Sequence, residues 1–113
     1  MRRLCLLPLL AVLAGCSTTG PATRCAPAEA RVENASALAV EQLYMAAIGE
    51  DWGPNLVGRG DLQSRAALPV RFAGAGRYAL RVVWVNGRAA ELQGIDGCMN
   101  RRITILDGGL RAE

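Results

Sequence analysis

Histidine is absent from the 113 residues, and this absence limits the chemistry that the chain can perform. Without an imidazole there is no Ser-His or Cys-His nucleophile pair, and the commonest metal ligand is missing. An enzyme would have to work with carboxylates alone, for example as a pair that faces across a cleft. We therefore expect a non-enzymatic protein that has no catalytic residues, no metal site and no cofactor.

Cysteine is the other residue type with distinctive chemistry, and one cysteine stands at the end of an apolar run. The chain starts with Met1-Arg2-Arg3, continues with the apolar stretch 4–13, and reaches Leu13-Ala14-Gly15-Cys16. A positive start, about 7–15 apolar residues and small residues before a cleavage site are typical of a secretory signal. The apolar run is shorter than the roughly 20 residues that a membrane span needs.

The four residues Leu13-Ala14-Gly15-Cys16 resemble the lipobox of bacterial lipoproteins. This resemblance implies that residues 1–15 are a signal peptide, helical before its removal, and that Cys16 carries a diacylglycerol group. Two or three acyl chains anchor a protein stably to a bilayer. Ser17 follows the cysteine, as in enterobacterial lipoproteins of the outer membrane, so we expect a lipid-anchored protein that faces the periplasm or the cell surface. The alternative is an ordinary secretory signal with a cysteine nearby by chance.

Two further cysteines remain once the signal peptide, which contains Cys5, and the lipid site are set aside. They are Cys25 and Cys98, and a compartment outside the cytoplasm oxidises thiols. We predict a Cys25–Cys98 disulfide, which the chain-entropy model values at roughly 4 kcal/mol for a loop of this length. The alternative is a pair of free, buried thiols.

The charge balance argues against a nucleic-acid partner. The formal net charge is +3, but Arg2 and Arg3 belong to the predicted signal peptide, so the mature chain is close to neutral. We expect residues 1–15 as signal peptide, 16–28 as a flexible tether and 29–113 as one small β domain. The expected partners are the membrane, through the lipid, and an unidentified protein.

Short alternating segments between turn residues predict an all-β domain, a small antiparallel β-sandwich or partial barrel. The inward-facing residues that we expect in three strands are Leu68, Val70 and Phe72, then Tyr78, Leu80, Val82 and Trp84, then Ile103 and Ile105. Asn86-Gly87 marks a hairpin, and matching its apolar faces requires a three-residue loop with Gly87 left-handed. That loop pairs Val82 with Ala90 and Leu80 with Leu92.

The segment 35–48 is ambiguous between helix and strand. Its alanines and other helix formers favour a helix, with Asn34 or Ser36 as the cap, whereas the surrounding strands favour a strand. As a simple strand it would place Val40 and Leu43 on opposite faces.

Glu50-Asp51-Trp52, with Asn55 three residues on, forms a polar cluster beside an aromatic residue. Carboxylates next to an indole could bind a cation or a sugar, and we take Glu50, Asp51, Trp52 and Asn55 as a candidate interaction surface. The oxygen spacing does not match an EF-hand loop. The alternatives are a solvated turn and, for Trp52, packing into the core.

Two resemblances bear on the domain. The chain is similar to a small exported bacterial β domain with no assigned activity, through Asn34-x-Ser36, Leu43-Tyr44, Trp52-Gly53-x-Asn55-Leu56, Tyr78-x-Leu80-Arg81, Asn86-Gly87, Gly94-x-Asp96-x-Cys98 and Ile103-x-Ile105. Gly74-Ala75-Gly76-Arg77-Tyr78, with Trp84, Ala90-x-Leu92 and Cys98, also resembles the membrane-bound lysozyme inhibitors. That second resemblance implies an inhibitor of a cell-wall hydrolase as the alternative to a structural or interaction module.

Overall fold

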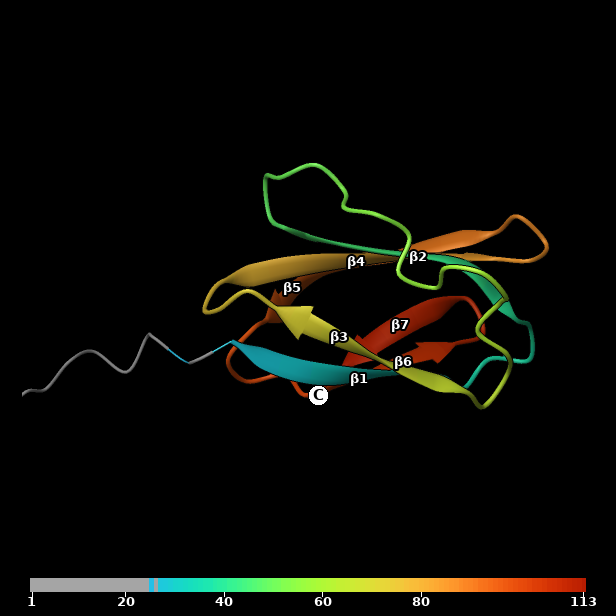
Figure 1. Ribbon diagram of the computed structural model, residues 1–113. Coiled ribbons are helices and arrows are strands. Elements are labelled where there is room, and N and C mark those ends of the chain that lie inside the picture. Colours follow the sequence, from blue (N-terminus) through green and yellow to red (C-terminus); the bar gives the residue numbers. More distant parts are fainter. Residues whose placement is uncertain (1–24, 26) are drawn as a thin grey trace, which may run out of the picture.

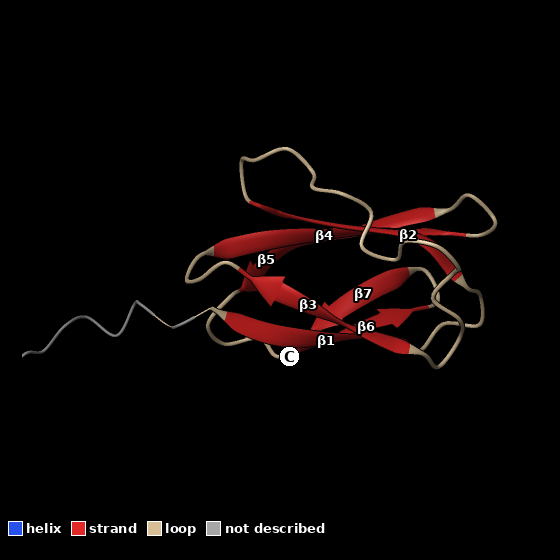
Figure 2. Ribbon diagram, in the orientation of Figure 1, coloured by secondary structure: helices blue, strands red, loops and turns tan. Residues whose placement is uncertain are grey.

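The computed structural model describes Cys25 and residues 27–113, which form seven strands and no helix (Figures 1 and 2). The predicted signal peptide 1–15, the predicted lipid site Cys16 and most of the predicted tether lie outside the described residues. The strands are β1 (Ala28–Asn34), β2 (Val40–Ala47), β3 (Ala67–Phe72), β4 (Arg77–Trp84), β5 (Ala89–Asp96), β6 (Arg102–Leu106) and β7 (Gly109–Ala112). Within these described residues, no helix has the length and hydropathy of a membrane span.

The strands form two sheets that pack face to face, so the expected all-β sandwich is confirmed. One sheet has the order β3-β1-β6-β7 and the other has the order β2-β4-β5. All neighbouring strands are antiparallel except β1 and β6, which run parallel. Parallel neighbours need a long crossover. Here the chain between β1 and β6 forms β3 and all three strands of the second sheet.

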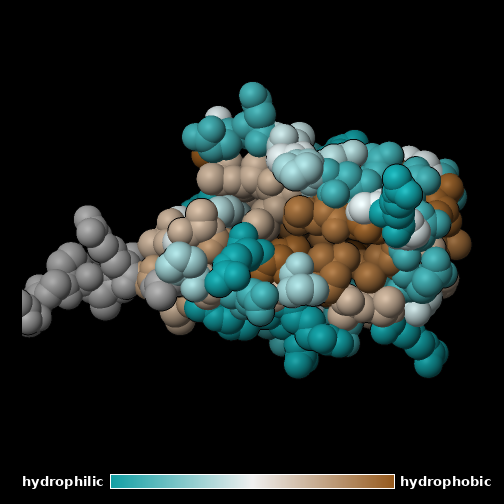
Figure 3. Space-filling model, in the orientation of Figure 1, coloured by the Kyte–Doolittle hydropathy of each residue, from teal (hydrophilic) through white to brown (hydrophobic). Residues whose placement is uncertain are grey.

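Apolar side chains from both sheets fill the space between them. Figure 3 shows hydrophobic residues gathered in the middle of the visible face, with hydrophilic residues around them. All the residues expected to face inward are buried except Leu68, which is half-buried at the edge of the core. The side chains buried without measurable exposure include Val32, Val40, Leu43, Phe72, Leu80, Val82, Ile103 and Ile105.

The ambiguous segment is strand β2, not a helix. Its helix-forming composition is overridden because Val40 and Leu43 bury completely against the core when the segment pairs with β4. The expectation that these two residues lie on opposite faces is wrong. A bulge between Val40 and Gln42 inserts one extra residue, so both side chains point inward.

The β4–β5 hairpin has the predicted geometry. Val82 pairs with Ala90 and Leu80 pairs with Leu92. Gly87 has φ +85° and its N–H donates to Trp84 O at 2.8 Å, which closes the three-residue loop. The predicted loop length is therefore confirmed, and the apolar faces of the two strands agree.

A buried polar network ties the β1–β2 loop to the second sheet. Asn34 is fully buried, and its Nδ2 donates to the carbonyls of Leu38 and Leu62, each at 2.9 Å. Its Oδ1 accepts the backbone N–H of Ser36 at 3.0 Å. The Ser36 hydroxyl in turn accepts the indole N–H of Trp84 at 3.0 Å. Neither Asn34 nor Ser36 caps a helix; both hold the end of the sandwich together.

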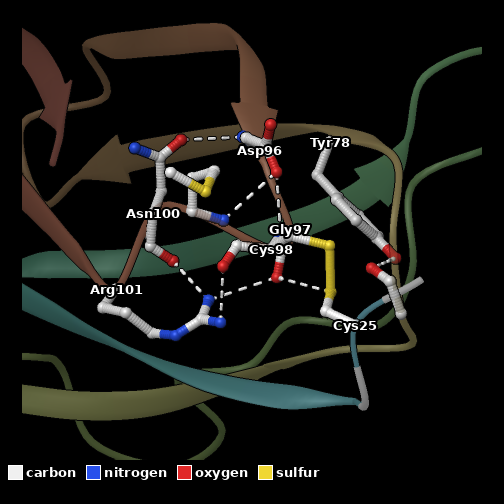
Figure 4. Close-up of a disulfide and its surroundings, with 9 residues drawn as sticks. Cys25, Tyr78, Asp96, Gly97, Cys98, Asn100 and Arg101 are labelled. Carbon is white, nitrogen blue, oxygen red and sulfur yellow. Dashed lines mark hydrogen bonds between the residues drawn. A yellow bond between two sulfur atoms is a disulfide. The ribbon is translucent and has the colours of Figure 1, made fainter. Parts of the chain in front are cut away.

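The predicted disulfide is present at the opposite end, where the chain enters the domain (Figure 4). The two sulfurs of Cys25 and Cys98 are 2.08 Å apart, with their Cα atoms at 5.6 Å. Asp96 stabilises the β5–β6 turn that carries Cys98, because its Oδ1 accepts the N–H groups of Cys98 and Met99. The Arg101 guanidinium donates to three carbonyls of the same turn, including Cys98 O at 2.6 Å.

Candidate interaction surface

Three large apolar side chains are exposed on the loop between β2 and β3. Ile48 is 49% exposed, and Trp52 and Leu56 are each 39% exposed. The possibility that Trp52 packs into the core is therefore wrong: this indole lies at the surface, unlike Trp84, which is 4% exposed. We call Ile48, Trp52 and Leu56 the loop surface.

Backbone hydrogen bonds hold this loop against the outer edge of β2. The N–H of Gly53 donates to Met45 O at 3.3 Å, and the N–H of Leu56 donates to Leu43 O at 2.8 Å. An unpaired edge strand invites association with other strands, and these bonds occupy part of the β2 edge. The loop in Figure 1 accordingly leaves the sheet at the end of β2 and returns along it.

Asn55 supports this arrangement from its side chain. Its Oδ1 accepts the N–H groups of Leu43 at 3.0 Å and Val57 at 3.1 Å, and its Nδ2 donates to Glu41 O at 3.2 Å. The half-buried carboxamide is thus committed to the backbone on both sides of the loop. Of the four residues in the predicted surface, Asn55 is the one whose side chain bonds to the backbone of β2 and of the loop.

Glu50 and Asp51 are exposed and directly precede Trp52 in the chain, so they add negative charge to this loop. Ion pairs within the described residues join Arg81 to Glu91 and Arg111 to Glu113, and neither loop carboxylate takes part in one. The described residues also contain no group of three or more acidic or cysteine side chains that could hold a metal ion. The chemistry that this surface offers is apolar contact plus negative charge.

The Gly74-Ala75-Gly76 loop, which carries the resemblance to the lysozyme inhibitors, lies against the disulfide turn. Tyr78 donates its hydroxyl proton to Gly74 O at 3.0 Å, and the N–H of Gly97 donates to Gly76 O at 3.0 Å. This loop is engaged in contacts within the domain, so its geometry adds no support to an inhibitory role.

Sequence reasoning named Asn55 but missed its role in holding the loop. Two of its hydrogen bonds reach β2 residues 12 and 14 positions away, and an alternating pattern gives no sign of such contacts. Comparison with known proteins adds no relative: no family model, no curated protein and no solved structure matches the chain.

Proposed function

We propose that the protein is a lipid-anchored, non-enzymatic interaction module of the bacterial outer membrane that binds a protein partner through the loop surface. The observation that supports this most directly is the exposure of Ile48, Trp52 and Leu56 on a loop whose backbone is already held in place. Large exposed apolar areas mark binding sites, and these three side chains come from one nine-residue segment of the loop. A loop ordered before binding loses less entropy when the partner arrives.

The chemistry of the surface indicates the kind of partner. A central Trp is the residue most often found to dominate binding energy at protein interfaces. Glu50 and Asp51 beside Trp52 would complement a basic rim on the partner. The same carboxylates would be repelled by an anionic lipid surface. A pocket on a protein is therefore a better binding partner for this loop than the bilayer. We therefore expect an apolar pocket that accepts the indole, bordered by Arg or Lys.

The position of the loop suggests that this partner is close to the membrane. β2 ends at Ala47, which pairs with Tyr78 at the end of the sandwich where Cys25 enters. If Cys16 carries the lipid, nine residue steps separate it from Cys25, a reach of about 30 Å when fully extended. The loop surface would then lie within a few nanometres of the bilayer, within reach of a membrane or membrane-associated protein.

The test compares two variants that each remove one exposed apolar side chain. Trp52→Ala removes the centre of the loop surface, and Val85→Ala removes a 43% exposed side chain in the β4–β5 turn, at the other end of the sandwich. After chemical cross-linking in cells, a defined partner should co-purify with the wild-type protein and with Val85→Ala but not with Trp52→Ala. Equal recovery with all three proteins would contradict the proposal.

Two further measurements distinguish a protein partner from a membrane contact and from a cell-wall hydrolase. In the first, Trp52 fluorescence is recorded on vesicles of anionic phospholipid. A shift to shorter wavelength that is equal with and without the partner would indicate a membrane contact instead. Inhibition of a lysozyme at micromolar concentration would identify the module as a hydrolase inhibitor, and lack of inhibition would remove that alternative.

A further inference from the structure

A hollow of about 220 Å³ lies at the end of the sandwich opposite the disulfide. Three loops form it, between β1 and β2, between β4 and β5, and between β6 and β7, with Trp84 at the end of β4. We call this hollow the distal pocket, and its lining residues are Ala37, Leu38, Trp84, Asn86, Arg88, Asp107 and Gly108.

The walls of the distal pocket are fixed by hydrogen bonds within the protein. The Oδ1 atom of Asp107 accepts the N–H of Ala37 at 2.7 Å, which joins two of the three loops. The Oδ1 atom of Asn86 accepts the N–H of Arg88 at 3.0 Å, which stabilises the conformation of the third loop, between β4 and β5. The indole N–H of Trp84 is held by the Ser36 hydroxyl of the buried network. A pocket formed in advance in this way is typical of small-molecule sites.

Two opposite charges line this pocket without neutralising each other. The ion pairs among the described residues are Arg81–Glu91 and Arg111–Glu113, so neither Arg88 nor Asp107 pairs with another charged side chain there. Asp107 uses its Oδ1 atom for the Ala37 N–H, and no hydrogen bond among the described residues involves its Oδ2 atom. The exposed Arg88 offers a planar set of N–H donors that matches a carboxylate.

We propose that the distal pocket binds a small zwitterion, the size of a dipeptide, with its carboxylate on Arg88 and its ammonium group on Asp107. The volume is below the roughly 300–1,000 Å³ of sites that enclose drug-sized ligands. Ala37, Leu38 and Trp84 provide an apolar wall for short aliphatic side chains between the two charges. This site is separate from the loop surface and does not depend on the proposed function.

The two tryptophans make the site easy to observe. Trp84 lines the distal pocket, whereas Trp52 lies in the β2–β3 loop, so the indole signal of Trp52 serves as an internal control. The experiment is an indole ¹⁵N–¹H NMR titration of the full chain in detergent micelles, with assignment from Trp52→Phe. The probes are alanyl-alanine in its L,L and D,D forms, together with the N-acetylated and the C-amidated dipeptide.

We expect the unmodified dipeptide to shift the Trp84 signal and leave the Trp52 signal in place. Blocking either charged end should weaken binding about tenfold or more, because each blocked form loses one charge-assisted hydrogen bond. Preference for the D,D form would indicate cell-wall peptides as the source, and preference for the L,L form would indicate protein fragments.

Variants test the assigned roles. Asp107→Asn keeps an oxygen for the Ala37 N–H and removes the charge, and Arg88→Gln removes the guanidinium; each should weaken binding about tenfold. Arg81→Gln removes an exposed arginine of an ion pair elsewhere and should leave binding unchanged. No Trp84 shift at millimolar dipeptide, equal binding of the blocked forms, or insensitivity to both pocket variants would overturn the proposal. Loss of dipeptide binding leaves the partner test at Trp52 unaffected, so the two proposals can fail separately.

Discussion

The buried carboxamide of Asn34 should be among the most sensitive polar positions of the domain. Replacement by Ala removes two donor bonds to backbone carbonyls and two bonds that Oδ1 accepts, from the N–H and from the hydroxyl of Ser36. Leu62 O retains the N–H of Val40, and Leu38 O can retain the Ser36 hydroxyl. The N–H of Ser36 loses its acceptor, the Oδ1 atom of Asn34. Ser36 is only 2% exposed, so this donor stays buried.

These losses set the expected magnitude for Asn34→Ala. A buried hydrogen bond contributes about 1 kcal/mol net, and an orphaned buried donor costs about 1–3 kcal/mol. We expect the free energy of unfolding to fall by roughly 3–4 kcal/mol. For a domain of this size, that corresponds to a decrease in Tm of at least about 12 °C.

The assay is urea and thermal unfolding of the oxidised protein, followed by circular dichroism. Asn86→Ala is the matched control, because Asn86 is exposed and makes one side-chain bond, to the N–H of Arg88. It should cost no more than about 1 kcal/mol. If Asn34→Ala and Asn86→Ala destabilise the domain equally, the reasoning about the buried network is wrong.

Three other changes should have defined effects. Replacing Cys25 and Cys98 by Ser should lower the free energy of unfolding by up to about 4 kcal/mol, and equal midpoints in urea for oxidised and reduced wild type would contradict this. Gly97→Ala should cost about 1–3 kcal/mol in the same assay, because the added Cβ would lie 2.5 Å from Gly74 O and 2.7 Å from a Tyr78 ring carbon; wild-type stability would refute the tight contact. Cys16→Ser should abolish palmitate labelling in growing cells, and persistent labelling would place the lipid elsewhere.

The sequence was sufficient to predict those parts of the fold that local rules control. Alternation identified the inward faces of β4 and β6, and the requirement for matching faces determined the three-residue loop that ends at Gly87. The disulfide followed from assigning the other cysteines to the signal peptide and the lipid. Each of these inferences needs only short-range pattern or counting.

The parts that could not be predicted depend on contacts between distant segments. Strand formation in 40–47 results from pairing with β4, and the bulge after Val40 reverses the expected face of Leu43. Asn34 and Ser36 look like helix caps locally, yet they bond to Leu62 and Trp84 across the domain. The side chain of Asn55 likewise bonds to backbone groups 12 and 14 residues away. The local sequence pattern therefore could not predict its supporting role.

Site-specific photo-cross-linking in intact cells tests the proposed partner binding at the loop surface most directly. A photoreactive amino acid would replace Leu56 in the loop surface or, as the control, Arg71 on the exposed side of β3. We expect a single protein adduct from position 56 that is absent from position 71 and is lost when Trp52→Ala is added. Adducts of equal yield from both positions, or adducts with lipid alone, would contradict partner binding through this loop.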